Sequence, residues 1–116
     1  MGKAAFRRAR KQAQCFNAIR ESDPSLFWSC LGAQLEGFRR RAEYHAWHLG
    51  SEDTPGKRVW ELMDVQTHFI DALHLSPEEK QCLLDESREI CRSAFGFVMP
   101  YCRRQLNWSP RLDMLP

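Results

Sequence analysis

The scarcity of β-branched residues constrains the fold of this chain more than any other feature of its sequence. Only eight of the 116 residues are Val, Ile or Thr, whereas Ala, Leu, Arg, Glu and Gln are abundant. β-Branched side chains favour strands, and the abundant residues favour helices. The length suits one domain, and 43% hydrophobic residues are enough for one core. We therefore predict an all-α fold, a small bundle of four to five helices.

Four segments show the apolar spacing of a helix. The first two predicted helices cover about 3–21 and 24–50, and an apolar stripe over 59–73 predicts the third. The fourth begins at Pro77. Pro100 lacks an amide hydrogen, so it either kinks this fourth helix or starts a short fifth one at about 101–107.

Local capping signals indicate where two of these helices begin. Asp23 can accept hydrogen bonds from the free amide groups that follow Pro24. Ser76 can cap the fourth helix while Glu79 reaches back to it, which is the capping-box pattern. In the second helix, Gly32 and Gly37 either cost about 1 kcal/mol each relative to alanine or mark a close contact between helices.

Short connections favour helices that pack antiparallel to their neighbours, so an up-down bundle is the default architecture. The long second helix could equally cross the others obliquely. We expect a single domain over residues 1–107. Residues 108–116 contain two prolines and predict an extended tail.

Cysteine usage and hydropathy indicate the compartment. The five cysteines are an odd number, and the charged N-terminus contains no apolar leader segment. No uncharged stretch is long enough to cross a membrane. We expect a cytoplasmic protein with no membrane contact, whose cysteines are mostly buried structural thiols.

Charge is distributed unevenly although its net value is only +2. Residues 1–20 contain six basic side chains and no acid, whereas residues 61–89 contain eight acids and two bases. Residues 90–116 contain four arginines and one aspartate. Two basic ends therefore flank an acidic middle, and such asymmetry bears on the choice of partners.

Clusters of Lys and Arg make nucleic acid the leading candidate partner, because these cations displace counterions from phosphates. Aromatic residues near them could stack on unpaired bases. Against this interpretation, the pI is only about 8.4, and no helix-turn-helix or RNA-recognition signature is present. Phosphate contacts do not specify sequence, so we expect sequence-independent binding within a larger nucleoprotein complex. The candidate residues are Arg7, Arg8, Lys11, Arg39, Arg40, Arg41, Arg103 and Arg104.

A protein–protein adaptor or inhibitor is the alternative function. In that interpretation the acidic segment occupies a basic groove on the partner, and the arginines serve only to solubilise the chain. Trp60 is expected at the edge of an apolar stripe, and Trp108 and Leu112 lie in the tail, so these three are candidate contacts with a protein partner or a second copy.

A small metal-dependent helical enzyme is the second alternative, and it would use His45, His48, His68 and His74. Helix bundles that bind two metal ions normally combine Glu-x-x-His motifs with further glutamates, and this chain lacks that set. It also lacks the motifs of activated nucleophiles and of phosphate or dinucleotide loops. We therefore predict a non-enzymatic protein with no cofactor and no metal.

Overall fold

The computed structural model describes residues 3–47 and 55–106, with side chains described for 3–46 and 58–94. Within these ranges the chain forms helices and no strand. The helices are α1 (Lys3–Ser22), α2 (Pro24–Trp47), α3 (Pro55–Asp71) and α4 (Pro77–Leu106). The predicted all-α bundle is confirmed, with four helices. The predicted tail, 108–116, lies outside the described residues.

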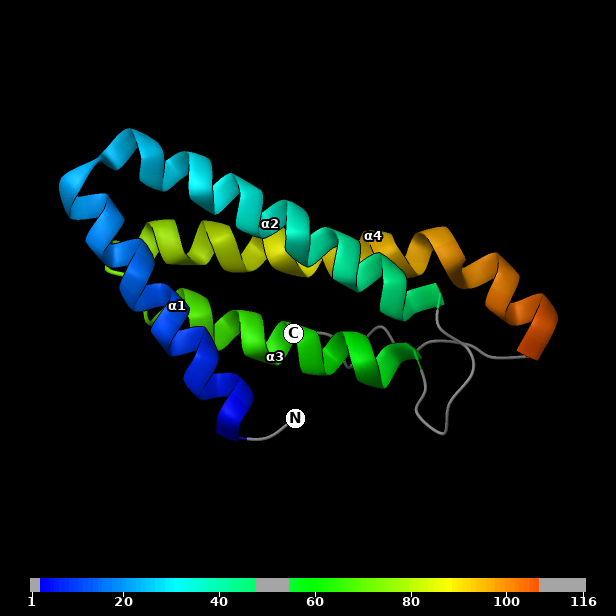
Figure 1. The fold of residues 1–116 in the computed structure, drawn as a ribbon. Coiled ribbons are helices and arrows are strands. Elements are labelled where there is room, and N and C mark those ends of the chain that lie inside the picture. Colours follow the sequence, from blue (N-terminus) through cyan, green and yellow to red (C-terminus); the bar gives the residue numbers. More distant parts are fainter. Residues whose placement is uncertain (1–2, 48–54, 107–116) are drawn as a thin grey trace.

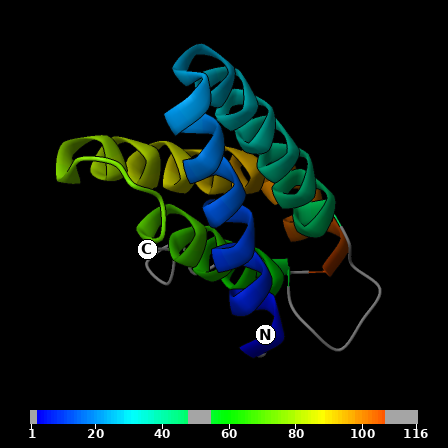
Figure 2. The ribbon, with the colours of Figure 1, turned by 60° about the vertical axis from the view of Figure 1, so that its left-hand side comes forward.

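Helices α2, α3 and α4 alternate in direction, as the short connections predict (Figure 1). The α2–α3 pair forms the middle of the molecule. Helix α1 packs against this pair from one side and α4 packs against it from the other (Figures 1 and 2). Helix α1 crosses its neighbours obliquely, and α2 is itself inclined to α4 in both views (Figures 1 and 2).

Both predicted capping sites form. The Leu26 amide donates to Oδ1 of Asp23 at 3.1 Å. At the start of α4, the Glu79 amide donates to Ser76 Oγ at 3.1 Å, and the Ser76 amide donates to Glu79 Oε1 at 3.0 Å. The bond from the Ser76 amide holds the pKa of the Glu79 carboxyl below its usual value, and the Arg20 charge adds to this. These short sequence signals are therefore sufficient to start α2 and α4.

Pro100 does not begin a new helix. Helix α4 continues through it to Leu106 and bends over its last turns (Figure 1). Proline removes one hydrogen bond from the helix and crowds the preceding turn, which commonly bends a helix without ending it. Of the two alternatives for this position, the kink is the one observed, and the fifth helix is absent from the described residues.

The core consists of two clusters that share the α2–α3 pair. One joins α2, α3 and α4 and is built on Phe38, Val59, Met63, Ile90 and Cys91, with small alanines between them. The other includes α1 and is built on the residues Ala9, Ala13, Phe27, Leu31, Phe69, Ile70, Leu73 and Leu83. Nearly all of these positions belong to the predicted apolar stripes, so periodicity alone locates the core.

Helix α1 reaches the core through small residues. Ala5, Ala9 and Ala13 recur every fourth position and are buried, which allows the α1 backbone to approach α2 and α3 closely. One turn further on, buried Asn17 donates to the Ala72 carbonyl at 3.0 Å and accepts from the His74 amide at 2.8 Å. Asn17 thus satisfies backbone groups left unpaired at the end of α3 and fixes α1 against it.

Neither glycine of α2 marks a close helix contact, so that interpretation is wrong. A β-carbon at Gly32 would meet no heavy atom of another element within 4 Å. One at Gly37 would meet only Nη1 of Arg41, at an ordinary distance of 3.6 Å. Both positions have room for alanine.

Replacing Gly32 with alanine is expected to stabilise the protein by about 1 kcal/mol, because alanine restricts the unfolded chain and favours the helix. Urea unfolding followed by circular dichroism measures the change. The reverse substitution at the next exposed position, Ala33→Gly, serves as the control and should destabilise by a similar amount. A Gly32→Ala variant that is less stable than the wild type would contradict this account.

The prediction that the cysteines are mostly buried is wrong for the described part of the chain. Cys91 is buried, but Cys15 and Cys82 are exposed and Cys30 is intermediate. Cys102 has no described side chain. Position beside an apolar stripe therefore does not distinguish a core cysteine from one that faces solvent.

Thiol reactivity should follow this distribution. Burial raises the pKa of Cys91 to about 12, so at neutral pH it is not a thiolate and is shielded from reagents. We expect iodoacetamide to label Cys15 and Cys82 in the native protein and to label Cys91 only after denaturation. Peptide mass spectrometry measures each site separately. Native labelling of Cys91 at the rate of Cys15 would contradict the packing described here.

Candidate nucleic-acid interface

The exposed side of α1 is densely basic. Its buried alanines face α2 and α3, which leaves its cations in solvent. Three of the predicted residues lie here, namely Arg7, Arg8 and Lys11. Two further exposed cations accompany them, Lys3 and Arg10. We call these five residues, Lys3, Arg7, Arg8, Arg10 and Lys11, the basic face of α1.

No carboxylate neutralises the basic face within the described residues. A helical cation usually finds its partner three or four positions away, and the first acid of the chain is Glu21. None of the five forms an ion pair in the described part of the structure. Arg20, at the far end of α1, is different: its Nη1 lies 3.9 Å from Oε1 of Glu79 and donates to the His74 carbonyl at 3.1 Å.

The structure separates the three consecutive arginines of α2. Arg39 and Arg40 both approach Glu36, with N–O distances of 3.6 and 3.7 Å. Arg41 forms no such pair in the described residues and extends back along α2 toward Gly37. Successive side chains on a helix point about 100° apart, so the three cannot form one patch. Of the three, Arg41 lines a pocket together with residues of α1.

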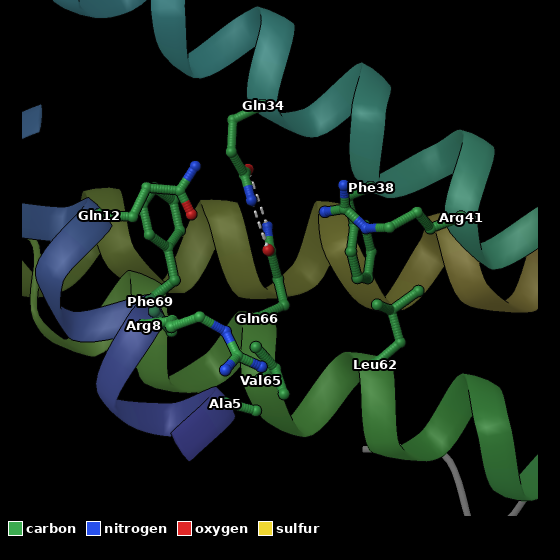
Figure 3. A pocket seen from close by; sticks show the side chains of 11 residues that line it. Ala5, Arg8, Gln12, Gln34, Phe38, Arg41, Leu62, Val65, Gln66 and Phe69 are labelled. Carbon is green, nitrogen blue, oxygen red and sulfur yellow. Dashed lines mark hydrogen bonds between the residues drawn. The ribbon is translucent and has the colours of Figure 1, made fainter. Parts of the chain in front are cut away.

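Arg41 and Arg8 line the same pocket. It lies between α1, α2 and α3 and has a volume of about 430 Å³ (Figure 3). Its polar lining includes Gln12, Gln34 and Gln66, and its apolar lining is Ala5, Ala9, Phe38, Leu62, Val65 and Phe69. Arginines from separate predicted clusters therefore line one pocket, and the rest of its lining is uncharged.

A hydrogen-bonded group forms one wall of this pocket. The side-chain amides of Gln34 and Gln66 donate to each other at 2.7 and 3.1 Å, and Gln66 also donates to Ser87 Oγ at 3.3 Å (Figure 3). Gln66 is only 3% exposed and Ser87 is fully buried. The group connects α2, α3 and α4 and holds the pocket wall in one position.

Acidic residues collect on the opposite side of the molecule. Glu78, Asp85, Glu86 and Glu89 are exposed on α4, which packs against the side of the α2–α3 pair away from α1 (Figure 2). The exposed acids of α4 and the basic face of α1 therefore lie on helices that pack on opposite sides of the α2–α3 pair, although Arg88 and Arg92 lie beside two of these acids.

Several candidate residues are not tested by this geometry. Arg103 and Arg104 lie on the last turns of α4, but their side chains are outside the described residues. Trp108 and Leu112 lie outside them as well. Trp60 is 41% exposed at the edge of the α3 stripe, where the spacing places it.

Among the described residues, the histidines of the metal alternative form no cluster. His68 stacks on Phe6 with ring centroids 4.0 Å apart, and His45 stacks edge-on with Tyr44. His74 lies after the end of α3, and His48 is outside the described residues. In the part of the chain that the structure describes, no three His, Cys, Asp or Glu side chains are grouped as metal ligands would be.

The candidate residues predicted from sequence omit Lys3 and Arg10 of the basic face, the Gln12–Gln34–Gln66 lining, and the fact that Arg8 and Arg41 share a pocket. The sequence does indicate that Arg8, Arg10 and Arg41 lack a helical partner, since no acid lies three or four positions from any of them. Arg39 and Arg40 have Glu36 at those spacings. The glutamine lining has no comparable signal.

Among the described helices, none is both long and apolar enough to cross a bilayer. No protein-family model, curated protein or solved structure matches this chain.

Proposed function

We propose that this protein is a cytoplasmic, non-enzymatic helical module that binds the sugar–phosphate backbone of nucleic acid, as a subunit or accessory of a larger nucleoprotein complex. The observation that carries the proposal is the basic face of α1, whose five cations are exposed and have no carboxylate partner within the described residues. Cations already paired within a protein gain less from a phosphate, because an existing ion pair must first be given up.

The arrangement of charge supports a backbone interface. Exposed Lys and Arg gain affinity by releasing counterions from phosphates, and this gain does not depend on base sequence. Arg8 and Arg41 extend the basic surface from α1 to α2. Helix α4, which carries exposed acids, packs on the other side of the α2–α3 pair, so it can meet a protein while α1 meets nucleic acid.

Fluorescence anisotropy with unrelated oligonucleotides tests the proposal. Single- and double-stranded RNA and DNA of mixed sequence should all bind at low salt, and two sequences of the same type should differ only a few-fold in affinity. A scrambled sequence serves as the control for specificity. The absence of binding by micromolar protein at low salt would refute the proposal.

A protein-binding adaptor is the second candidate function, and exposed apolar side chains favour it. Leu26, Trp28 and Trp60 are each more than two-fifths exposed, and large apolar side chains of this kind anchor protein interfaces. This function predicts a stoichiometric partner that is retained by tagged protein after nuclease treatment and lost in a Trp60→Ala variant. A retained protein that nuclease releases would instead support the nucleoprotein proposal.

A further inference from the structure

The pocket between α1, α2 and α3 contains two guanidinium groups and no acid. In Figure 3, Arg8 reaches inward from α1 and Arg41 from α2, and the Gln34–Gln66 pair lies between them in this view. Every other residue that lines the pocket is uncharged. Like charges that share a pocket repel each other, and a bound anion converts this repulsion into attraction.

Other arginines of the described chain show how such charges are usually neutralised. Arg39, Arg40, Arg88 and Arg92 each lie within 4 Å of a carboxylate three or four positions away. The second pocket beside α1 contains an arginine too, Arg10, but Glu21 also lines it. The pocket of Arg8 and Arg41 is therefore distinctive in combining two cations with a neutral lining.

We propose that this pocket binds one nucleotide, with the phosphate held between the guanidinium groups of Arg8 and Arg41. The inference rests on the proposed function. It adds one defined nucleotide site to a basic surface whose other phosphate contacts are not tied to a pocket. Guanidinium groups bind phosphate oxygens through paired, charge-assisted hydrogen bonds. The oxygens would accept from N–H groups of both arginines, one from each side of the pocket.

The size and lining of the pocket favour a nucleotide over a bare phosphate. Its volume of about 430 Å³ lies within the range of pockets that hold small organic ligands. Gln12 is exposed, and its amide forms no hydrogen bond in the described part of the structure, so it can bond to a sugar hydroxyl. Leu62 and Val65 are half-buried and give the sugar or base an apolar surface.

Phosphate binding can be measured separately from nucleic-acid binding. The probes are adenosine 5′-monophosphate, uridine 5′-monophosphate, adenosine and inorganic phosphate, titrated into the full chain while its glutamine side-chain amide resonances are followed by NMR. Both monophosphates should shift the resonances of Gln12 and Gln34 and bind at least about tenfold more tightly than adenosine, because adenosine lacks the charged group.

Matched variants identify the residues responsible. Arg8→Ala combined with Arg41→Ala should weaken binding of the monophosphates at least about tenfold. The control, Arg39→Ala combined with Arg40→Ala, removes the same charge from two arginines that lie beside Glu36 and leaves the pocket lining intact. Thermal unfolding of both variants checks that each is folded. An equal loss in the two variants would overturn the inference, since charge alone would then explain the binding.

The remaining outcomes separate this inference from the proposed function. If oligonucleotides bind but monophosphates shift no pocket resonance, the nucleotide site is wrong and backbone binding stands. If monophosphates bind through Arg8 and Arg41 but oligonucleotides do not bind, the pocket binds free nucleotides, and the proposal of backbone binding is wrong. Inorganic phosphate that binds as tightly as the monophosphates would overturn the assignment to a nucleotide.

Discussion

Replacing Arg7, Arg10 and Lys11 together with alanine is expected to weaken binding to a single-stranded oligonucleotide about 100-fold at low salt, because three fewer counterions are released. All three side chains are exposed and unpaired within the described structure. Alanine is the best helix former, so α1 should keep its structure. The variant retains Arg8 and Arg41, and its affinity therefore reports on the exposed surface of α1 and not on the pocket.

The matched control is the triple variant Arg39→Ala, Arg40→Ala and Arg92→Ala. It removes three arginines that lie beside carboxylates, the half-buried Arg39 and the exposed Arg40 at Glu36, and the exposed Arg92 at Glu89. We expect a loss of less than about tenfold, because these cations are partly neutralised within the protein. Equal losses in the two variants would show that net charge, and not the basic face of α1, determines binding. They would also mean that Arg39 and Arg40 contribute to nucleic-acid binding.

Replacing Gln66 with alanine is expected to destabilise the protein by about 2 to 4 kcal/mol, measured by urea unfolding. The change removes buried volume and deprives fully buried Ser87 of the amide that donates to it. Gln34 also loses its hydrogen-bond partner, but it is half-buried, so water can replace part of the lost hydrogen bonding. Most of the destabilisation should therefore come from the cavity and from Ser87.

Two variants test this interpretation of Gln66. Gln12→Ala removes a glutamine that lines the same pocket without an internal hydrogen bond in the described residues, and it should change stability by less than about 0.5 kcal/mol. Gln66→Ala combined with Ser87→Ala should cost less than the sum of the two single changes, because each single change leaves one group unpaired. Fully additive energies would show that the two side chains do not depend on each other.

Local signals were enough to predict the helices and most of the core. Asp23 and Ser76 act on amide groups within three positions of themselves, so their effect is readable in a short stretch of sequence. The apolar stripes are equally local, since helical periodicity fixes which residues share a side. Even polar Gln66 falls on the α3 stripe and is buried where that stripe predicts.

Features that depend on the packing of distant helices could not be predicted in this way. Asn17 bonds to residues 55 and 57 positions away, and no spacing rule connects them. The pocket that Arg8 and Arg41 share depends on which side of α2 faces α1. Arg39, Arg40 and Arg41 look like one patch in the sequence. Because neighbouring side chains on a helix point about 100° apart, Arg39 and Arg40 lie beside Glu36 whereas Arg41 lines the pocket.

The dependence of affinity on salt tests most directly whether the basic face of α1 binds phosphates. If this face and Arg41 contact five or six phosphates of a single strand, the slope of log affinity against log salt concentration should be about −3.5 to −4. Anisotropy titrations of the wild type at several salt concentrations give this slope. A slope flatter than about −1 would mean that at most one phosphate is contacted, and it would contradict the account.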